Sequence, residues 1–187
     1  MPNADVPIYV QLVSGTVLGI ALGNLLSGAA KFIQQPHSYR INWLHGLWIV
    51  FLLGTIMMFW WEEAMTFSAV QWNFWLYLFQ IIYCATYLFT TAVLLPDDVE
   101  QWGSHYDYLI ARRHWFYGAL ILSYVLGIGN ELVKEGWDGS LVDPTYLVIN
   151  VLVIAVLVTA SVVNRPRLHL AVAALFVLLM IGNMLLE

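Results

Sequence analysis

Six long apolar stretches, separated by short polar segments, follow one another along the chain. They cover residues 9–30, 42–61, 74–95, 115–133, 146–163 and 168–186. Each holds close to the roughly 20 apolar residues that a helix needs to cross the ~30 Å hydrocarbon core of a bilayer. Nearly every position of residues 147–158 is apolar, whereas the strands of a membrane barrel alternate apolar and polar residues. The pattern predicts an all-α integral membrane protein built as a six-transmembrane-helix bundle.

The polar segment between the third and fourth spans has a pattern of its own. Asp97 and Glu100 have the spacing of a capping box at the start of a helix. Apolar and aromatic residues then recur at helical intervals, at Val99, Trp102, Tyr106, Leu109 and Ile110. This predicts a short amphipathic helix on the cytoplasmic membrane surface. A structureless loop is the alternative, because Gly103 and Ser104 interrupt the pattern.

Composition narrows the class of protein further. Of the 187 residues, 61% are hydrophobic and only 10% are charged, which leaves no room for a soluble domain beside six spans. We therefore treat residues 1–187 as a single transmembrane domain. With 7 basic against 12 acidic residues and no basic tract, the chain is not a nucleic-acid binder. The lone Cys84 provides neither a disulfide framework nor a thiolate metal cluster.

The basic residues predict the orientation of the bundle. Six of the 7 lie in the first, third and fifth loops, at Lys31, Arg40, Arg112, Arg113, Arg165 and Arg167. Only Lys134 lies on the other side. The positive-inside rule places those three loops in the cytoplasm and both termini in the periplasm or outside the cell.

Several short motifs occur together in a fixed order between residues 42 and 120. They are WLHGLW at residues 43–48, FWW at 59–61, LLPDD at 94–98, YDY at 106–108 and RRHWFYG at 112–118. In this combination the chain resembles a group of uncharacterised multi-pass bacterial inner-membrane proteins. The resemblance implies a bacterial inner (plasma) membrane location, and it transfers no activity and no catalytic residue.

The first span carries a face of small residues. Gly15, Gly19 and Gly23 follow one another at intervals of four, and Ser27 continues the series. Such a face lets a second helix approach closely in a membrane. Two interpretations stay open: packing against another span of the same chain, or a seam between copies in a homo-oligomer.

Three histidines each stand near the start of an even-numbered span, at His45, His114 and His169. With the predicted orientation, all three lie near the cytoplasmic interface. Imidazole nitrogens there could ligate a haem or chlorin, or contact a quinone. The alternative is that they anchor the helices at the interface, as neighbouring tryptophans do.

Acidic residues mark the opposite side. Glu62 and Glu63 follow the aromatic run at residues 59–61, and Glu131 stands at the end of the fourth span. Carboxylates at such an outer mouth concentrate cations or attract a basic protein. They could equally be solvated helix ends. No charged residue lies near the centre of a span, which argues against proton-coupled transporters.

These features point to a small inner-membrane protein in contact with the lipid bilayer. We expect it to act as a pore or ion-conducting unit, or as an accessory subunit of a membrane assembly. The alternative is a membrane redox protein that uses the histidines. No spacing matches a zinc motif or a paired-carboxylate acid/base site. We therefore assign no catalytic residue and no metal ligands, and we expect no enzymatic chemistry.

Overall fold

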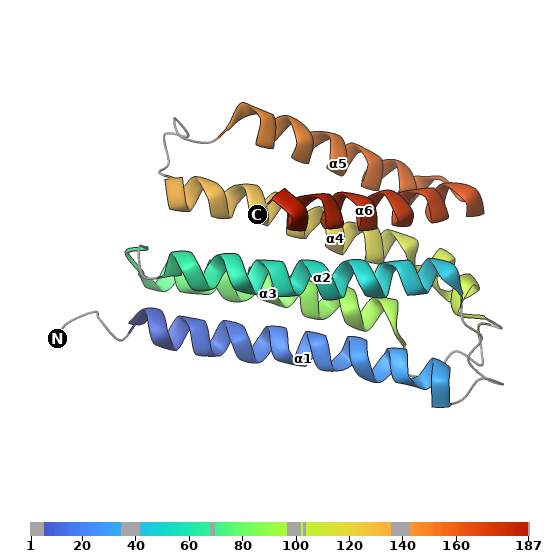
Figure 1. The fold of residues 1–187 in the computed structure, drawn as a ribbon, viewed down its shortest axis with the longest axis horizontal. Coiled ribbons are helices and arrows are strands. Elements are labelled where there is room, and N and C mark those ends of the chain that lie inside the picture. Colours follow the sequence, from blue (N-terminus) through green and yellow to red (C-terminus); the bar gives the residue numbers. More distant parts are fainter. Residues whose placement is uncertain are drawn as a thin grey trace.

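The computed structural model describes residues 6–34, 42–67, 70–96, 102, 104–135 and 143–186. Within these residues the chain forms six α-helices that run along the length of the molecule, with α5 and α6 tilted away from the others (Figure 1). They are α1 (Val6–Gln34), α2 (Trp43–Thr66), α3 (Phe74–Leu94), α4 (His105–Glu135), α5 (Pro144–Val162) and α6 (Pro166–Leu186). Each of the six is long and apolar enough to cross a membrane. The predicted all-helical, multi-pass architecture is confirmed at this level.

Polar residues fix where several helices begin. The side-chain oxygens of Asn42, Asn73 and Asp143 each accept a hydrogen bond from a backbone N–H in the first turn of the following helix. In α5 the cap is followed directly by Pro144, which needs no such partner. These contacts satisfy N–H groups that a helix leaves unpaired at its start.

The polar segment before the fourth span differs from the prediction. Residues 105–113 form the first turns of α4 and are continuous with the span itself. The cap is at Ser104. Its hydroxyl oxygen accepts a hydrogen bond from the Asp107 N–H, and the same hydroxyl donates to the Asp107 carboxylate. The proposed start at Asp97 and Glu100 lies outside the described residues, so a separate surface helix is not confirmed.

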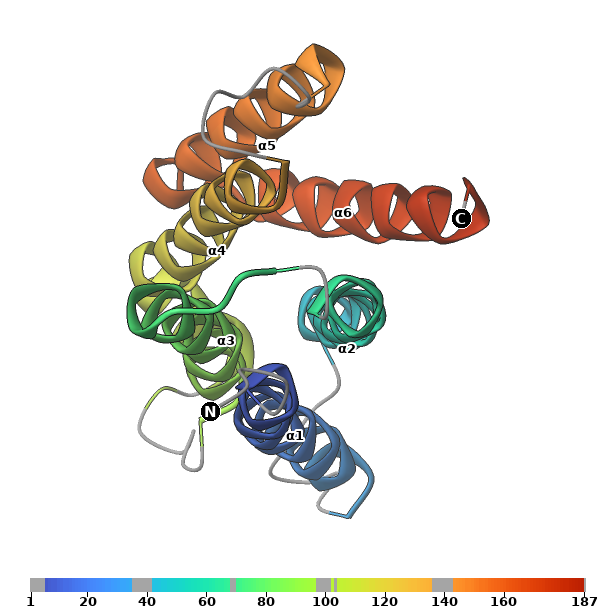
Figure 2. The same ribbon diagram turned by 90° about the vertical axis from the view of Figure 1, so that its left-hand side faces the viewer.

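The helices form two groups when the bundle is viewed along its axis (Figure 2). α1, α3, α4 and α5 follow one another in a row, each packed against the next. α2 lies beside this row and contacts α1, α3 and α4, while α6 crosses over α2 at a steep tilt.

Aromatic rings fill the space between α2, α4 and α6. Trp48 is fully buried, and its ring lies 5.0 Å from that of Phe116 and 5.5 Å from that of Phe176, measured between centroids. Phe51 and Tyr117 complete the contacts around Trp48. The space between these three helices is therefore a packed aromatic core.

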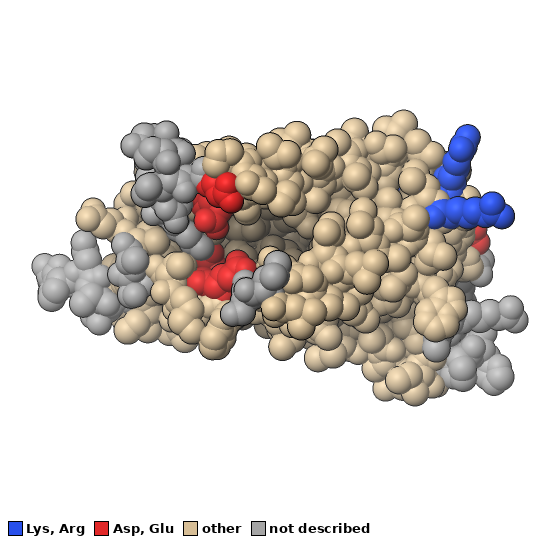
Figure 3. Space-filling model, turned by 45° about the horizontal axis from the view of Figure 1, so that its top comes forward, with Lys and Arg blue, Asp and Glu red and all other residues tan. Residues whose placement is uncertain are grey.

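Charged residues separate to the two ends of the bundle (Figure 3). The acidic end is formed by the C-terminal ends of α2 and α4 and the start of α5. It carries Glu62, Glu63, Glu131 and Asp143. The basic end is formed by the C-terminal end of α1, the first turns of α4 and the turn from α5 into α6. It carries Lys31, Arg112, Arg113, Arg165 and Arg167, together with Asp107.

Candidate functional site

A carboxylate is buried at the acidic end. α2 continues to Thr66, beyond the boundary expected at residue 61, so Glu63 lies inside the helix. Its spacing from Leu52, Ile56 and Phe59 puts it on the buried face of α2, and only 5% of its surface is exposed. The neighbouring Glu62 points outward and is exposed. The two adjacent acids therefore have different environments.

Two amide side chains hold the Glu63 carboxylate. The Asn130 Nδ2 of α4 donates to Oε1 over 2.7 Å, and the Gln80 Nε2 of α3 donates to Oε2 over 3.2 Å. Both donors are themselves buried. These two hydrogen bonds join α2, α3 and α4 through the Glu63 carboxylate. Both donors are neutral amide groups.

A small cavity lies beside Glu63. Its volume of about 10 Å³ is close to the space that one water molecule needs. Four polar side chains line it, from Gln11, Ser14, Glu63 and Gln80. The Ser14 hydroxyl is buried and has no hydrogen-bond partner in the described part of the chain. A water molecule in this cavity could therefore form a hydrogen bond with the Ser14 hydroxyl.

A larger cavity of about 680 Å³ adjoins the small one. It lies between the first turns of α1 and the segment that joins α2 to α3, which contributes Val70, Gln71, Trp72 and Asn73. Gln11, Ala64 and Phe67 line both cavities. Glu63 is therefore separated from the acidic end by a short, partly polar passage, which we call the outer vestibule.

The other predicted acids, Glu62 and Glu131, lie at the same end of the bundle but line neither cavity. Figure 3 shows acidic side chains on both sides of a hollow in the surface at this end. Glu62 and Glu131 both lie close enough to Tyr146, in the first turn of α5, to interact with it electrostatically. The structure thus brings Glu62, Glu63 and Glu131 to one end and buries only Glu63.

A glycine allows tyrosine hydroxyls to reach this region. The Tyr83 hydroxyl oxygen lies 2.9 Å, and the Tyr146 hydroxyl oxygen 3.9 Å, from the position that a Cβ atom would have on Gly127. Any side chain at this position of α4 would displace the Tyr83 hydroxyl. Gly127 thus lets phenol groups from α3 and α5 approach the backbone of α4.

The three predicted histidines do not converge. His45 and His169 are fully buried near the basic end, and the His169 Nδ1 lies 2.8 Å from the Tyr117 hydroxyl. His114 instead faces outward and lines a groove of about 510 Å³ between α3 and α4. The ring beside His45 belongs to His105, at a centroid distance of 5.5 Å, a residue that the sequence did not single out. Among the described residues, no group of three or more His, Cys, Asp or Glu side chains could hold a metal ion.

The small-residue face of α1 divides into two parts. A Cβ on Gly15 would lie 1.9 Å from the Trp60 ring, so this glycine packs against α2. No atom lies within 4 Å of a Cβ built on Gly19 or Gly23, and Ser27 is exposed. Packing within one chain therefore accounts for Gly15, and a seam between copies stays a proposal for Gly19, Gly23 and Ser27.

Two glycine variants separate these roles. We expect Gly15→Leu to lower the melting temperature in detergent, because the Trp60 ring must move and overpacking costs about 1–3 kcal/mol. Gly19→Leu should leave the fold of one chain intact and reduce the mass of the oligomer, because a leucine side chain prevents close approach of a second helix. Thermal unfolding and light scattering measure the two effects. An unchanged mass for Gly19→Leu would mean that this face contacts lipid.

When compared with known proteins, the chain matches no protein-family model, no curated protein and no solved structure.

Proposed function

We propose that the protein is an ion-handling unit of the bacterial inner membrane that binds a small cation or a proton at Glu63. The observation that carries this proposal is a buried carboxylate whose two oxygens are held by neutral amides of two other helices. Glu63 lies in the last turn of an apolar helix, and a buried ionisable side chain in a membrane protein is costly and commonly marks an ion or proton pathway. A carboxylate that merely ended the helix would lie in solvent, as Glu62 does.

The outer vestibule supports access from the acidic end. It leads through Gln11 and Phe67 to the small polar cavity beside Glu63. The surrounding carboxylates raise the local concentration of cations, an attraction that salt weakens as the Debye length falls to about 8 Å. With the basic end in the cytoplasm, as the positive-inside rule proposes, cations reach Glu63 from the periplasm.

The aromatic core constrains how an ion could continue. Trp48, Phe116 and Phe176 are buried between α2, α4 and α6. Conduction through one chain requires these rings to move, and conduction between chains requires an oligomer. An accessory subunit that binds the ion and passes it to a partner protein needs neither ring movement nor an oligomer. A pore and an accessory subunit therefore differ in whether the isolated protein supports ion flux.

Two single variants test the proposal in reconstituted liposomes. We expect Glu63→Gln to abolish cation or proton flux, because it keeps the shape of the side chain and removes its charge. Glu62→Gln is the matched control, and its smaller effect should weaken at high salt because Glu62 is exposed and its field is screened. Equal loss from both variants would contradict a special role for Glu63. Binding of a cation without flux from the wild-type protein would identify the accessory role.

The groove between α3 and α4 favours a second candidate, contact with a membrane quinone. Ala85, Gly118 and Ala119 leave room in the groove, and His114 and Trp115 add a hydrogen-bonding and a stacking group. A quinone ring offers carbonyl acceptors that an imidazole N–H can bind. Quenching of tryptophan fluorescence by a ubiquinone analogue, lost in His114→Leu, tests this candidate. A visible absorption spectrum of the purified protein tests the haem or chlorin alternative.

A further inference from the structure

A second polar group is buried near the basic end, away from Glu63. We call it the inner polar cluster, and it consists of His45, Trp48, Tyr106, Tyr117 and His169. Five of its side-chain atoms are buried without a hydrogen-bond partner in the described part of the chain. They are both ring nitrogens of His45, the Trp48 Nε1, the Tyr106 hydroxyl oxygen and the His169 Nε2. Buried polar atoms are nearly always paired, so this concentration requires an explanation.

These side chains are neighbours from three helices. The Tyr117 hydroxyl of α4 contacts the His169 ring of α6, and the Tyr117 ring lies 5.9 Å from the Trp48 ring of α2. His45 stands one helical turn before Trp48 on the same buried face of α2. Tyr106 follows His105, whose ring lies edge-on to His45. The unpaired atoms thus occupy one region between the ends of α2, α4 and α6.

The chemistry of these atoms defines the ligand that would satisfy them. A neutral imidazole has one donor and one acceptor nitrogen, a phenol can do both, and an indole N–H only donates. A ligand must therefore both accept and donate hydrogen bonds, which water does. A metal cation cannot accept the Trp48 N–H. Buried water molecules typically make two to four hydrogen bonds to such groups.

The charges around the cluster also disfavour a metal cation as its resident ligand. Lys31 of α1 acts electrostatically on His105, and Arg113 acts on His169. Arg113 itself donates to the carbonyl oxygens of Ile110 and Ser161. The carboxylate nearest to the cluster in sequence is Asp107, which acts on Tyr106. Two cationic side chains and one acid thus face the cluster from α1 and α4.

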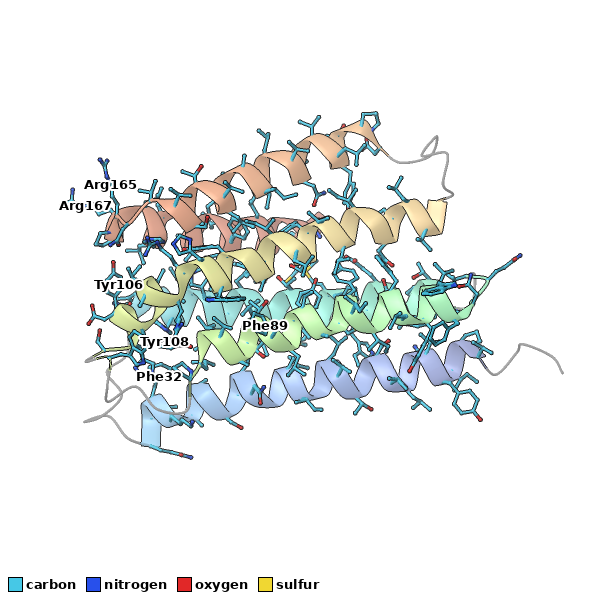
Figure 4. The ribbon with its side chains drawn as sticks, turned by 180° about the vertical axis from the view of Figure 1, so that it is seen from behind. Phe32, Phe89, Tyr106, Tyr108, Arg165 and Arg167 are labelled. Atoms are coloured by element: carbon cyan, nitrogen blue, oxygen red, sulfur yellow. The ribbon has the colours of Figure 1, made fainter. Side chains whose placement is uncertain are left out.

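We propose that the inner polar cluster binds internal water and passes protons between the basic face and the bundle interior. A neutral imidazole accepts a proton from hydronium at one nitrogen and releases its original proton from the other nitrogen to a second water. The imidazole is thereby regenerated as its other tautomer, and one hydronium is consumed and one formed. Tyr106 is half-buried and lies towards the end of the bundle that carries Arg165 and Arg167, so the cluster extends close to the basic face (Figure 4).

Nuclear magnetic resonance of the full chain in nanodiscs, with 15N-labelled histidine, tests the proposal. We expect magnetisation transfer from water to the His45 and His169 imidazole N–H groups, and exchange of both protons within seconds in D2O. His45→Phe assigns the His45 signals, and His114→Phe assigns those of the outward-facing ring. Imidazole protons of wild-type His45 that persist for hours in D2O, without transfer from water, would overturn the proposal.

Two further measurements separate this site from Glu63 and from a purely structural role. Glu63→Gln should leave the water contacts of His45 unchanged, so a failed ion-flux experiment does not decide this question. In His45→Phe, proton exchange at His169 should slow several-fold, because the relay loses one of its two imidazoles. Unchanged exchange at His169 would overturn the relay, and His45→Gln repeats the measurement should the phenylalanine variant fail to fold.

Discussion

Trp48→Ala is expected to lower the free energy of unfolding by about 3 kcal/mol. The ring is fully buried and lies within 5.0–5.9 Å of the Phe51, Phe116, Tyr117 and Phe176 rings, measured between centroids. Its removal leaves a cavity that these rings cannot fill without leaving their own contacts. Large-to-small core substitutions of aromatic residues cost about 3–5 kcal/mol in soluble proteins. We place the loss at the lower end, because lipid is as apolar as the core and packing alone is lost.

The effect should concentrate on α6. This helix contacts α2 and α5, and Phe176 of α6 packs directly on Trp48. Trp43→Ala is the matched control, because Trp43 lies on the same helix and is 79% exposed. Unfolding of the two purified variants in detergent, followed by the helical signal in far-ultraviolet circular dichroism, measures both losses of stability. Similar losses in the two variants would show that the aromatic core does not hold α6 in place.

The sequence predicted the six spans because their signal is local. Continuous apolar runs of about 20 residues need no knowledge of tertiary contacts. The boundaries were less accurate, because hydropathy ends a span at the first charged residue. α2 extends past Glu62 and Glu63 because its buried face continues through Glu63. α4 begins at His105 because Ser104 and Asp107 cap its first turn. A charged residue on an inward face does not end a helix.

The buried stripe of α2 was a signal that periodicity could have revealed. His45, Trp48, Leu52, Ile56, Phe59 and Glu63 are all buried and recur at intervals of three or four residues. The two ionisable residues of this stripe stand at its two ends. Following the stripe from the apolar positions would have predicted that Glu63 points inward and Glu62 outward.

Which histidine of α4 points inward depends on the face of the helix that carries it. The two are nine residues apart, and about 100° of rotation for each residue places them on opposite sides of the helix. His105 shares the buried face with Leu109, Phe116 and Leu120, whereas His114 faces outward. Proximity to the start of the hydrophobic span singled out His114, whereas the periodicity of buried positions identifies His105 as the inward-facing histidine of α4.

The partners of Glu63 could not be predicted from local pattern at all. Asn130 is separated from Glu63 by 67 positions and Gln80 by 17. Their meeting depends on how α3 and α4 pack against α2. Gln80 and Asn130 are neutral side chains on separate spans, and nothing in their local sequence links either of them to a carboxylate.

Asn130→Leu is expected to lower the free energy of unfolding by about 2–3 kcal/mol, because it leaves one buried carboxylate oxygen without its 2.7 Å donor. The same substitution in a Glu63→Gln background should cost only about 1 kcal/mol, since an unpaired amide oxygen is less costly to bury than a charge. Asn183→Leu, on an exposed face of α6, is the control and should stay within about 0.5 kcal/mol of wild type.

The difference between the two backgrounds is the coupling energy of the Glu63–Asn130 pair, which a double-mutant cycle isolates. Equilibrium unfolding of the four proteins in the same detergent measures it. A coupling energy of about 1–2 kcal/mol would mean that Asn130 stabilises a charged Glu63 in the folded protein. A coupling near zero would mean that the carboxylate is neutral or hydrated in the fold. In that case Glu63 does not hold a charge between amides, and the proposed ion site loses its physical basis.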